Sequence, residues 1–135
     1  MERPETLARL FFTLVADRNR VDLAALLHPD VVFQPLSIPG VHEGRDNVMN
    51  SFYETVYSWP LYDVYATTFE HHDENTVLTR GRLRWMSNGQ LHDSHAVWTI
   101  TFQDGYLYRL TSGEPSNHVN PQDSLTEERD GNNPA

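Results

Sequence analysis

The dipeptide Asn88-Gly89 lies between two long runs in which apolar and polar residues alternate, and this arrangement constrains the fold more than any other part of the sequence. Both residues tolerate the positive φ angles of a type I′ turn, the two-residue turn that joins antiparallel strands. The runs 76–86 and 91–102 are therefore expected to form a β-hairpin.

A two-residue turn also fixes which residues lie opposite each other, because it pairs Trp85 with His92 and Leu83 with Ser94. The face that carries these residues is mostly apolar, so we expect it to face the core. The opposite face is expected to be the outer one, and it carries a row of charged and titratable side chains: Arg80, Arg82, Arg84, Asp93 and His95.

The turn at Asp104-Gly105 leaves two registers open. A two-residue loop would set charged residues opposite apolar ones. A three-residue loop with a bulge at Gly105 instead pairs Ile100 with Tyr108 and Trp98 with Leu110. The second register keeps apolar side chains together, and it is the one predicted here.

The residues before position 60 have a helical period. Apolar side chains recur at the spacing of one helical face in Leu7, Leu10, Phe11, Leu14 and Val15. Two further helices are predicted at residues 22–27 and 46–58, with a short strand at residues 31–36 between them. Two more strands are predicted at residues 61–71 and 106–112.

Helices followed by a meander of long strands predict an α+β fold. We expect three N-terminal helices to pack in the concave face of a strongly curved, mostly antiparallel sheet, which forms a cone with an internal pocket. Residues 1–114 would make this domain. Residues 115–135 are rich in Pro, Asn, Asp, Glu and Ser and are expected to form a flexible tail.

Composition excludes several classes of function. The net charge is −9 and no run is basic, so we expect no nucleic-acid partner. No stretch approaches the roughly 18 apolar residues of a membrane span, and no export signal is present, which favours a cytoplasmic protein away from the membrane.

The chain has no cysteine, its adjacent His71 and His72 would point to opposite faces of a strand, and it lacks phosphate and dinucleotide loops. We therefore expect neither a metal nor a cofactor.

Polar residues on the inner face are the candidates for chemistry. His92 would act as the acid–base group, because a neutral imidazole titrates near pH 6.5. Ser94, Tyr53 and Tyr108 would polarise an oxygen of the substrate. The alternative for His92 is a structural ring stacked on Trp85. The rest of the predicted lining binds the hydrophobic substrate and comprises Leu14, Phe33, Phe52, Leu83, Trp85, Trp98, Leu110 and Ser112.

The chain resembles the SnoaL-like polyketide cyclase and ketosteroid isomerase group of the nuclear transport factor superfamily. The resemblance lies in the order of its motifs: the segment 22–31, then Gly40 and Gly44, then the two hairpin turns. The resemblance covers about residues 5–114. It implies the cone-shaped α+β fold, and a homodimer that forms through the outer face of the sheet. Activities of the group include isomerisation, cyclisation and dehydration, and some members have no catalytic role.

The catalytic residues of the group carry over poorly. The base and oxyanion donors of the isomerases fall on Pro35, Leu14 and Trp98, and the acid of several cyclases falls on Ser112. A dehydratase-like histidine falls near His92. We therefore consider a dehydratase, isomerase or cyclase that moves a proton on a small hydrophobic cyclic or aromatic molecule. The alternatives are a non-catalytic binder of such a molecule and an interaction protein whose interior is filled by its own side chains.

Overall fold

The computed structural model describes residues 3–38 and 40–114, and the predicted tail at 115–135 lies outside them. Three helices are present: α1 (Pro4–Ala16), α2 (Arg20–Leu26) and α3 (Arg45–Glu54). Pro4 occupies the first turn of α1, where its missing N–H costs nothing. The buried face of α1 includes Ala8 and Phe12, whereas Leu10, predicted to face the core, is 43% exposed. The apolar stripe is therefore turned toward Phe12.

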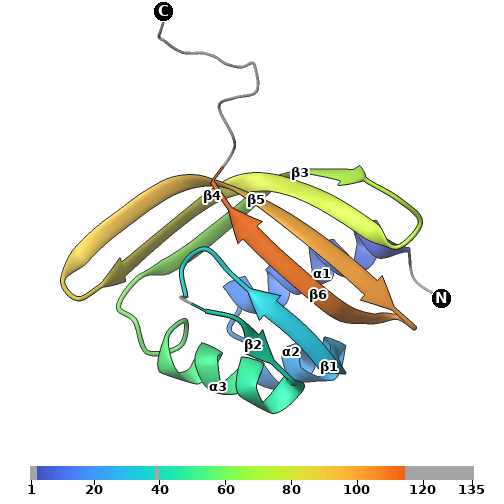
Figure 1. Cartoon of the computed structure of the whole chain (residues 1–135). Helices are drawn as coiled ribbons and strands as arrows, with labels where there is room; N and C mark the ends of the chain where they lie inside the picture. The colour runs from blue at the N-terminus through green and yellow to red at the C-terminus, as the bar shows by residue number, and fades with distance from the viewer. Residues whose placement is uncertain (1–2, 39, 115–135) are drawn as a thin grey trace, which may run out of the picture.

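One sheet of six strands covers the helices (Figure 1). The strands are β1 (Leu27–Gln34), β2 (His42–Glu43), β3 (Tyr62–His71), β4 (Thr76–Ser87), β5 (Gln90–Gln103) and β6 (Tyr106–Gly113). Their order is β2-β1-β6-β5-β4-β3, and every neighbouring pair is antiparallel except β1 with β6. The predicted α+β class and the mostly antiparallel sheet are thus confirmed. The sheet stays open, with β2 and β3 as its edges.

The helices pack on one side of the sheet. Figure 1 shows the bent strands β4 and β5 arching over α1, with α2 and α3 below β1. Helix α1 contacts β3, β4 and β5, while α2 and α3 contact β1. Among the described residues, no helix is long and apolar enough to cross a membrane.

The hairpin register predicted at Asn88-Gly89 is confirmed. Both residues have positive φ, 53° and 74°, and Trp85 pairs with His92 and Leu83 with Ser94. The predicted faces follow: Trp85 is 9% exposed, whereas the Arg82 side chain is 52% exposed on the other face.

The register predicted at Asp104-Gly105 is wrong. Both residues have positive φ, 55° and 83°, and they form a two-residue turn that pairs Gln103 with Tyr106. The irregularity lies further along β6, so that Ile100 pairs with Leu110 and Trp98 with Ser112. The bulge takes up Tyr108 and lets both Leu107 and Leu110 be buried. The bulge thereby allows a two-residue turn while the apolar side chains of β5 and β6 stay on the same face of the sheet.

Two boundaries and one element also differ from the prediction. Strand β1 begins at Leu27 instead of residue 31, and its pairing with β6 is irregular between Leu27 and Val32. Helix α3 ends at Glu54 instead of residue 58. The two-residue strand β2 was not predicted. It pairs antiparallel with β1, Val32 opposite Glu43 and Phe33 opposite His42, a contact that no local pattern specifies.

Candidate functional site

An aromatic interior lies between α1 and the sheet. Its rings meet edge to face: Phe12 and Trp98 at 4.9 Å between centroids, Phe33 and Phe52 at 5.6 Å, and Phe11 and Phe33 at 6.0 Å. Aromatic pairs prefer this geometry because the positive ring edge meets the negative ring face. The remaining lining residues are Val15, Pro35, Tyr62, Val64 and Leu110.

The space left inside this lining is about 20 Å³. Pockets for drug-sized molecules have roughly 300–1,000 Å³. The predicted internal pocket is therefore filled by side chains as the chain stands. A molecule could enter only if these side chains moved.

Tyr62 carries the one hydroxyl among the described side chains that line the interior. Its hydroxyl lies 3.1 Å from Ser37 Oγ, at a hydrogen-bonding distance. Burial raises the pKa of the Tyr62 hydroxyl, and the hydrogen bond with Ser37 opposes part of that shift. Nearby, the backbone N–H of Leu36 donates to Ser112 Oγ at 2.6 Å, which joins the segment after β1 to β6. At neutral pH Tyr62 can therefore donate a hydrogen bond to an oxygen of a bound molecule.

His92 lies on the inner side of the hairpin and stacks on Trp85. The two ring centroids are 4.7 Å apart and the rings are 11° from parallel. His92 is half-buried and does not line the aromatic interior. The structural stacking considered from the sequence is thus present.

Ser94 is paired with a carboxylate. Its Oγ lies 2.8 Å from Glu114 Oε2, just beyond the end of β6, and 2.9 Å from the backbone oxygen of His95, so its single proton is donated to one of these two acceptors. Ser94 and His92 are two residues apart on the same face of β5, roughly 7 Å along the strand. A hydroxyl and a carboxylate are therefore in contact on the face that also carries the imidazole of His92.

Tyr53 and Tyr108 do not join this group. Tyr53 is 45% exposed and lies in a groove between α2 and α3. Tyr108, at the bulge of β6, packs edge-on against His28 with 5.0 Å between ring centroids. Their predicted inward orientation is wrong, because α3 turns its Phe52 inward and because the bulge changes the alternation in β6.

The predicted substrate-binding residues divide into two groups. Phe33, Phe52, Trp98 and Leu110 line the aromatic interior. The others are placed around it: Leu14, Leu83 and Trp85 are buried in the surrounding core, and Ser112 accepts the bond from Leu36. Among the described residues, no group of three or more His, Asp or Glu side chains is arranged to hold a metal ion.

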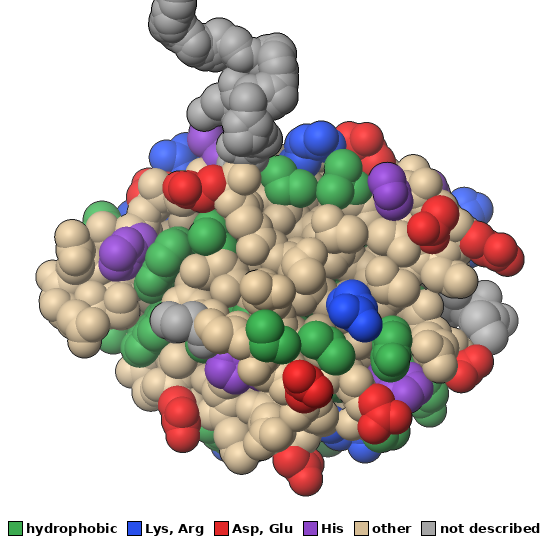
Figure 2. Space-filling model, in the orientation of Figure 1, with side chains coloured by type: hydrophobic (Ala, Val, Ile, Leu, Met, Phe, Trp, Pro, Cys, Tyr) green, Lys and Arg blue, Asp and Glu red, His purple; other side chains and the backbone are tan. Residues whose placement is uncertain are grey.

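The outer face of the sheet carries the predicted charged row. Asp93 accepts two hydrogen bonds from Arg82, at 2.7 and 3.2 Å, while Arg84 Nε lies 3.6 Å from Asp93 Oδ2. The nearer partner of Asp93 is thus Arg82, although Arg84 is the residue directly opposite Asp93 in the ladder. Hydrogen bonding from Arg82 holds the pKa of Asp93 below its usual value. On the face of the molecule that Figure 2 shows, the basic side chains stand singly and most acidic side chains lie toward the rim.

Residues 8–110 match the model of the SnoaL-like domain family. The chain belongs to this family. The match begins within α1 and ends within β6, which confirms the resemblance inferred from the order of the motifs. No match among curated proteins is found by sequence.

Solved structures share the fold of this SnoaL-like domain. An NTF2-like protein of unknown function from Burkholderia pseudomallei has a TM-score of 0.72 and 16% identity over 85% of this chain and 92% of its own. A Mycobacterium tuberculosis protein in complex with estradiol-17β-hemisuccinate has a TM-score of 0.71 and 15% identity over 82% and 93%. TerC, co-crystallised with polyporic acid, has a TM-score of 0.69 and 18% identity over 83% and 92%. At such identities the likeness shows the fold alone.

Several residues of the candidate site were not predicted: the apolar lining residues Phe11, Phe12, Val15, Pro35 and Val64, and two polar residues, Tyr62 and Glu114. Tyr62 pairs with Trp85 across β3 and β4, so extending the alternation of Val64 back by two residues would have found it. Glu114 falls at the junction with the predicted tail. The alternation of Leu110 and Ser112 points to it, but only if the strand face is taken to continue past Gly113.

Proposed function

We propose that this SnoaL-like domain binds a small, flat, hydrophobic cyclic or aromatic molecule in its aromatic interior. The observation that carries the proposal is a wall of aromatic and aliphatic side chains with one buried hydroxyl, that of Tyr62. Ligand sites are typically apolar, with a few polar groups that set the orientation of the ligand. The two ligands crystallised with proteins of this fold, estradiol-17β-hemisuccinate and polyporic acid, support the choice of ligand class.

Binding in this interior needs a rearrangement of its side chains, because the space left is about 20 Å³. The edge-to-face contacts of Phe11, Phe12 and Phe33 would open as these rings turn to stack on the ligand. Such a rearrangement lowers the apparent affinity, since the binding-competent state is only partly populated in the free protein.

Titration with estradiol-17β-hemisuccinate and polyporic acid, followed by methyl NMR signals, tests the proposal. We expect one of them to shift the signals of Val15, Val64 and Leu110, which line the interior. Tyr62→Phe should weaken this binding about fivefold, the effect of one lost neutral hydrogen bond. Tyr65→Phe is the matched control, because Tyr65 is 49% exposed on the same strand. Binding that leaves these three methyl signals unchanged, or no binding of either compound, contradicts the proposal.

A second candidate function is proton transfer on the same class of molecule, as in a dehydratase, isomerase or cyclase. The contact of Ser94 with Glu114, on the face that carries His92, favours it. The carboxylate of Glu114 would take a proton from the substrate, and the imidazole of His92 would return one to it. With a substrate in hand, His92→Ala and Glu114→Gln should each lower kcat by at least about a hundredfold. Unchanged turnover in both variants contradicts this candidate.

A further inference from the structure

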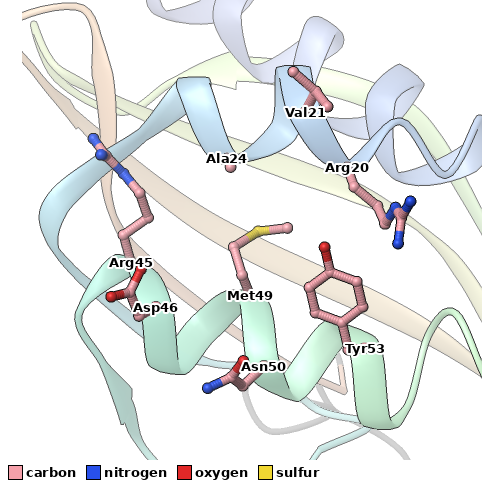
Figure 3. Close-up of a pocket in the computed structure, with 8 residues that line it drawn as sticks. All are labelled: Arg20, Val21, Ala24, Arg45, Asp46, Met49, Asn50 and Tyr53. Carbon is pink, nitrogen blue, oxygen red and sulfur yellow. The ribbon is translucent and has the colours of Figure 1, made fainter.

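A second hollow lies on the outside of the helical layer, between α2 and α3 (Figure 3). Its volume is about 660 Å³, which is within the range of sites for small molecules. Ala24 of α2 and the buried Met49 of α3 form an apolar floor, and Val21, 79% exposed, forms part of the rim. Apolar surface is therefore open to solvent in a concave place.

Arg20 and Tyr53 form one end of this α2–α3 groove. The guanidinium carbon of Arg20 lies 5.3 Å from the centre of the Tyr53 ring, a cation–π distance that holds the charge beside the groove. Within residues 3–38 and 40–114, no carboxylate is at ion-pair distance from Arg20. Its guanidinium therefore has donors left for an anion.

The other end of the groove is less suited to an anion. Arg45 donates from Nε and Nη2 to the backbone oxygen of Leu27, at 3.1 and 2.8 Å, so its guanidinium already holds α3 to β1. The carboxylate of Asp46 also lines this end and would repel a second negative charge. The negative group of a ligand thus belongs at the Arg20 end, with an uncharged body toward Asp46.

We propose that the α2–α3 groove binds a small aromatic carboxylate. The carboxylate accepts charge-assisted hydrogen bonds from Arg20, and the aromatic ring lies against Tyr53 and over Met49 and Ala24. The chain as a whole carries a charge of −9, so long-range attraction does not explain the binding of an anion. Recognition depends on the local guanidinium, and the site is separate from the aromatic interior.

The test uses 2-naphthoate as the probe and neutral 2-naphthamide as its uncharged analogue. Binding to the full chain is measured by calorimetry, and the site is located by amide NMR shifts. We expect 2-naphthoate to bind more tightly than 2-naphthamide and to shift the signals of Ala24, Met49 and Tyr53. Arg20→Gln should weaken the binding of 2-naphthoate at least about tenfold and leave that of 2-naphthamide unchanged.

Arg109→Gln is the matched control, because Arg109 is also an exposed arginine near a tyrosine ring, 5.9 Å from that of Tyr108, but lies outside the groove. It should bind 2-naphthoate like the unaltered chain. A second variant, Ala24→Leu, fills the floor and should abolish the binding of both probes. Equal affinity for the two probes, or equal losses in Arg20→Gln and Arg109→Gln, would overturn the proposal.

Discussion

Gly81→Ala should strongly destabilise the sheet, because β3 passes Gly81 too closely for any side chain. Gly81 pairs with Ala66, where the register between β3 and β4 shifts. A Cβ atom at Gly81 would lie 1.8 Å from the carbonyl oxygen of Tyr65 and 2.8 Å from its carbonyl carbon. These are backbone atoms, so the clash is relieved only if the strands move apart by more than 1 Å, since 1.8 Å must grow to at least 3.0 Å. Overpacking of a core costs about 1–3 kcal/mol, and a clash with backbone belongs at the upper end, about 3 kcal/mol.

Urea unfolding followed by tryptophan fluorescence measures this loss. With a slope of about 2 kcal/mol per M, a loss of about 3 kcal/mol lowers the midpoint by about 1.5 M. Gly113→Ala is the matched control, since a Cβ at Gly113 meets no atom within 4 Å and its φ is not positive. That change should stabilise the folded chain by about 0.5 kcal/mol, because alanine lowers the conformational entropy of the unfolded chain. A midpoint for Gly81→Ala within about 0.3 M of the unaltered chain would refute the reasoning.

Three further predictions concern the core and the outer face. Thr79 is fully buried and its Oγ1 has no hydrogen-bond partner among the described residues, so Thr79→Val should raise stability by about 1 kcal/mol in the same urea assay, and a loss would contradict this. Hydrogen bonding from Arg82 lowers the pKa of Asp93 in the folded chain, so the ionised carboxylate adds stability above about pH 4 that is lost as the pH falls through the folded pKa. Asp93→Asn should therefore lower the urea midpoint more at pH 7 than at pH 2.5, and an equal effect at both would be inconsistent with it. If the outer face forms a homodimer, light scattering should find a dimer whose dissociation constant rises at least about tenfold in Arg82→Glu. The control Arg9→Glu, on α1, should leave this constant unchanged. A monomer at all concentrations would exclude that interface.

The sequence was sufficient to predict the strand pairing wherever one local signal determined it. Asn88-Gly89 fixed the longest hairpin, because only one short turn suits these residues, and the parity of Trp85 and Arg82 followed from it. The strand register after the turn at Asp104-Gly105 was predicted wrongly, because it depends on a bulge three residues later, at Tyr108. That bulge is set by the pairing of β6 with β1 as well as β5.

The site was harder to predict than the fold. Phe52 and Tyr53 are adjacent in α3, and only the packing of that helix against β1 decides that Phe52 turns inward. Nor does the sequence show how completely the rings would fill the interior, since a space of about 20 Å³ depends on rotamers and on the approach of α1. Tertiary packing has thus mostly closed the internal pocket that was expected within the cone.

The parallel pairing of β1 with β6 has a consequence for synthesis. Backbone groups along one side of β1 find their partners only in the last strand, so this edge cannot be completed until residues 107–111 have left the ribosome. Until then Val31 and Phe33 belong to a half-built sheet whose nascent edge can recruit another chain. Translation arrested after β5 should therefore yield a species that needs a holding chaperone, and release of β6 should end that need.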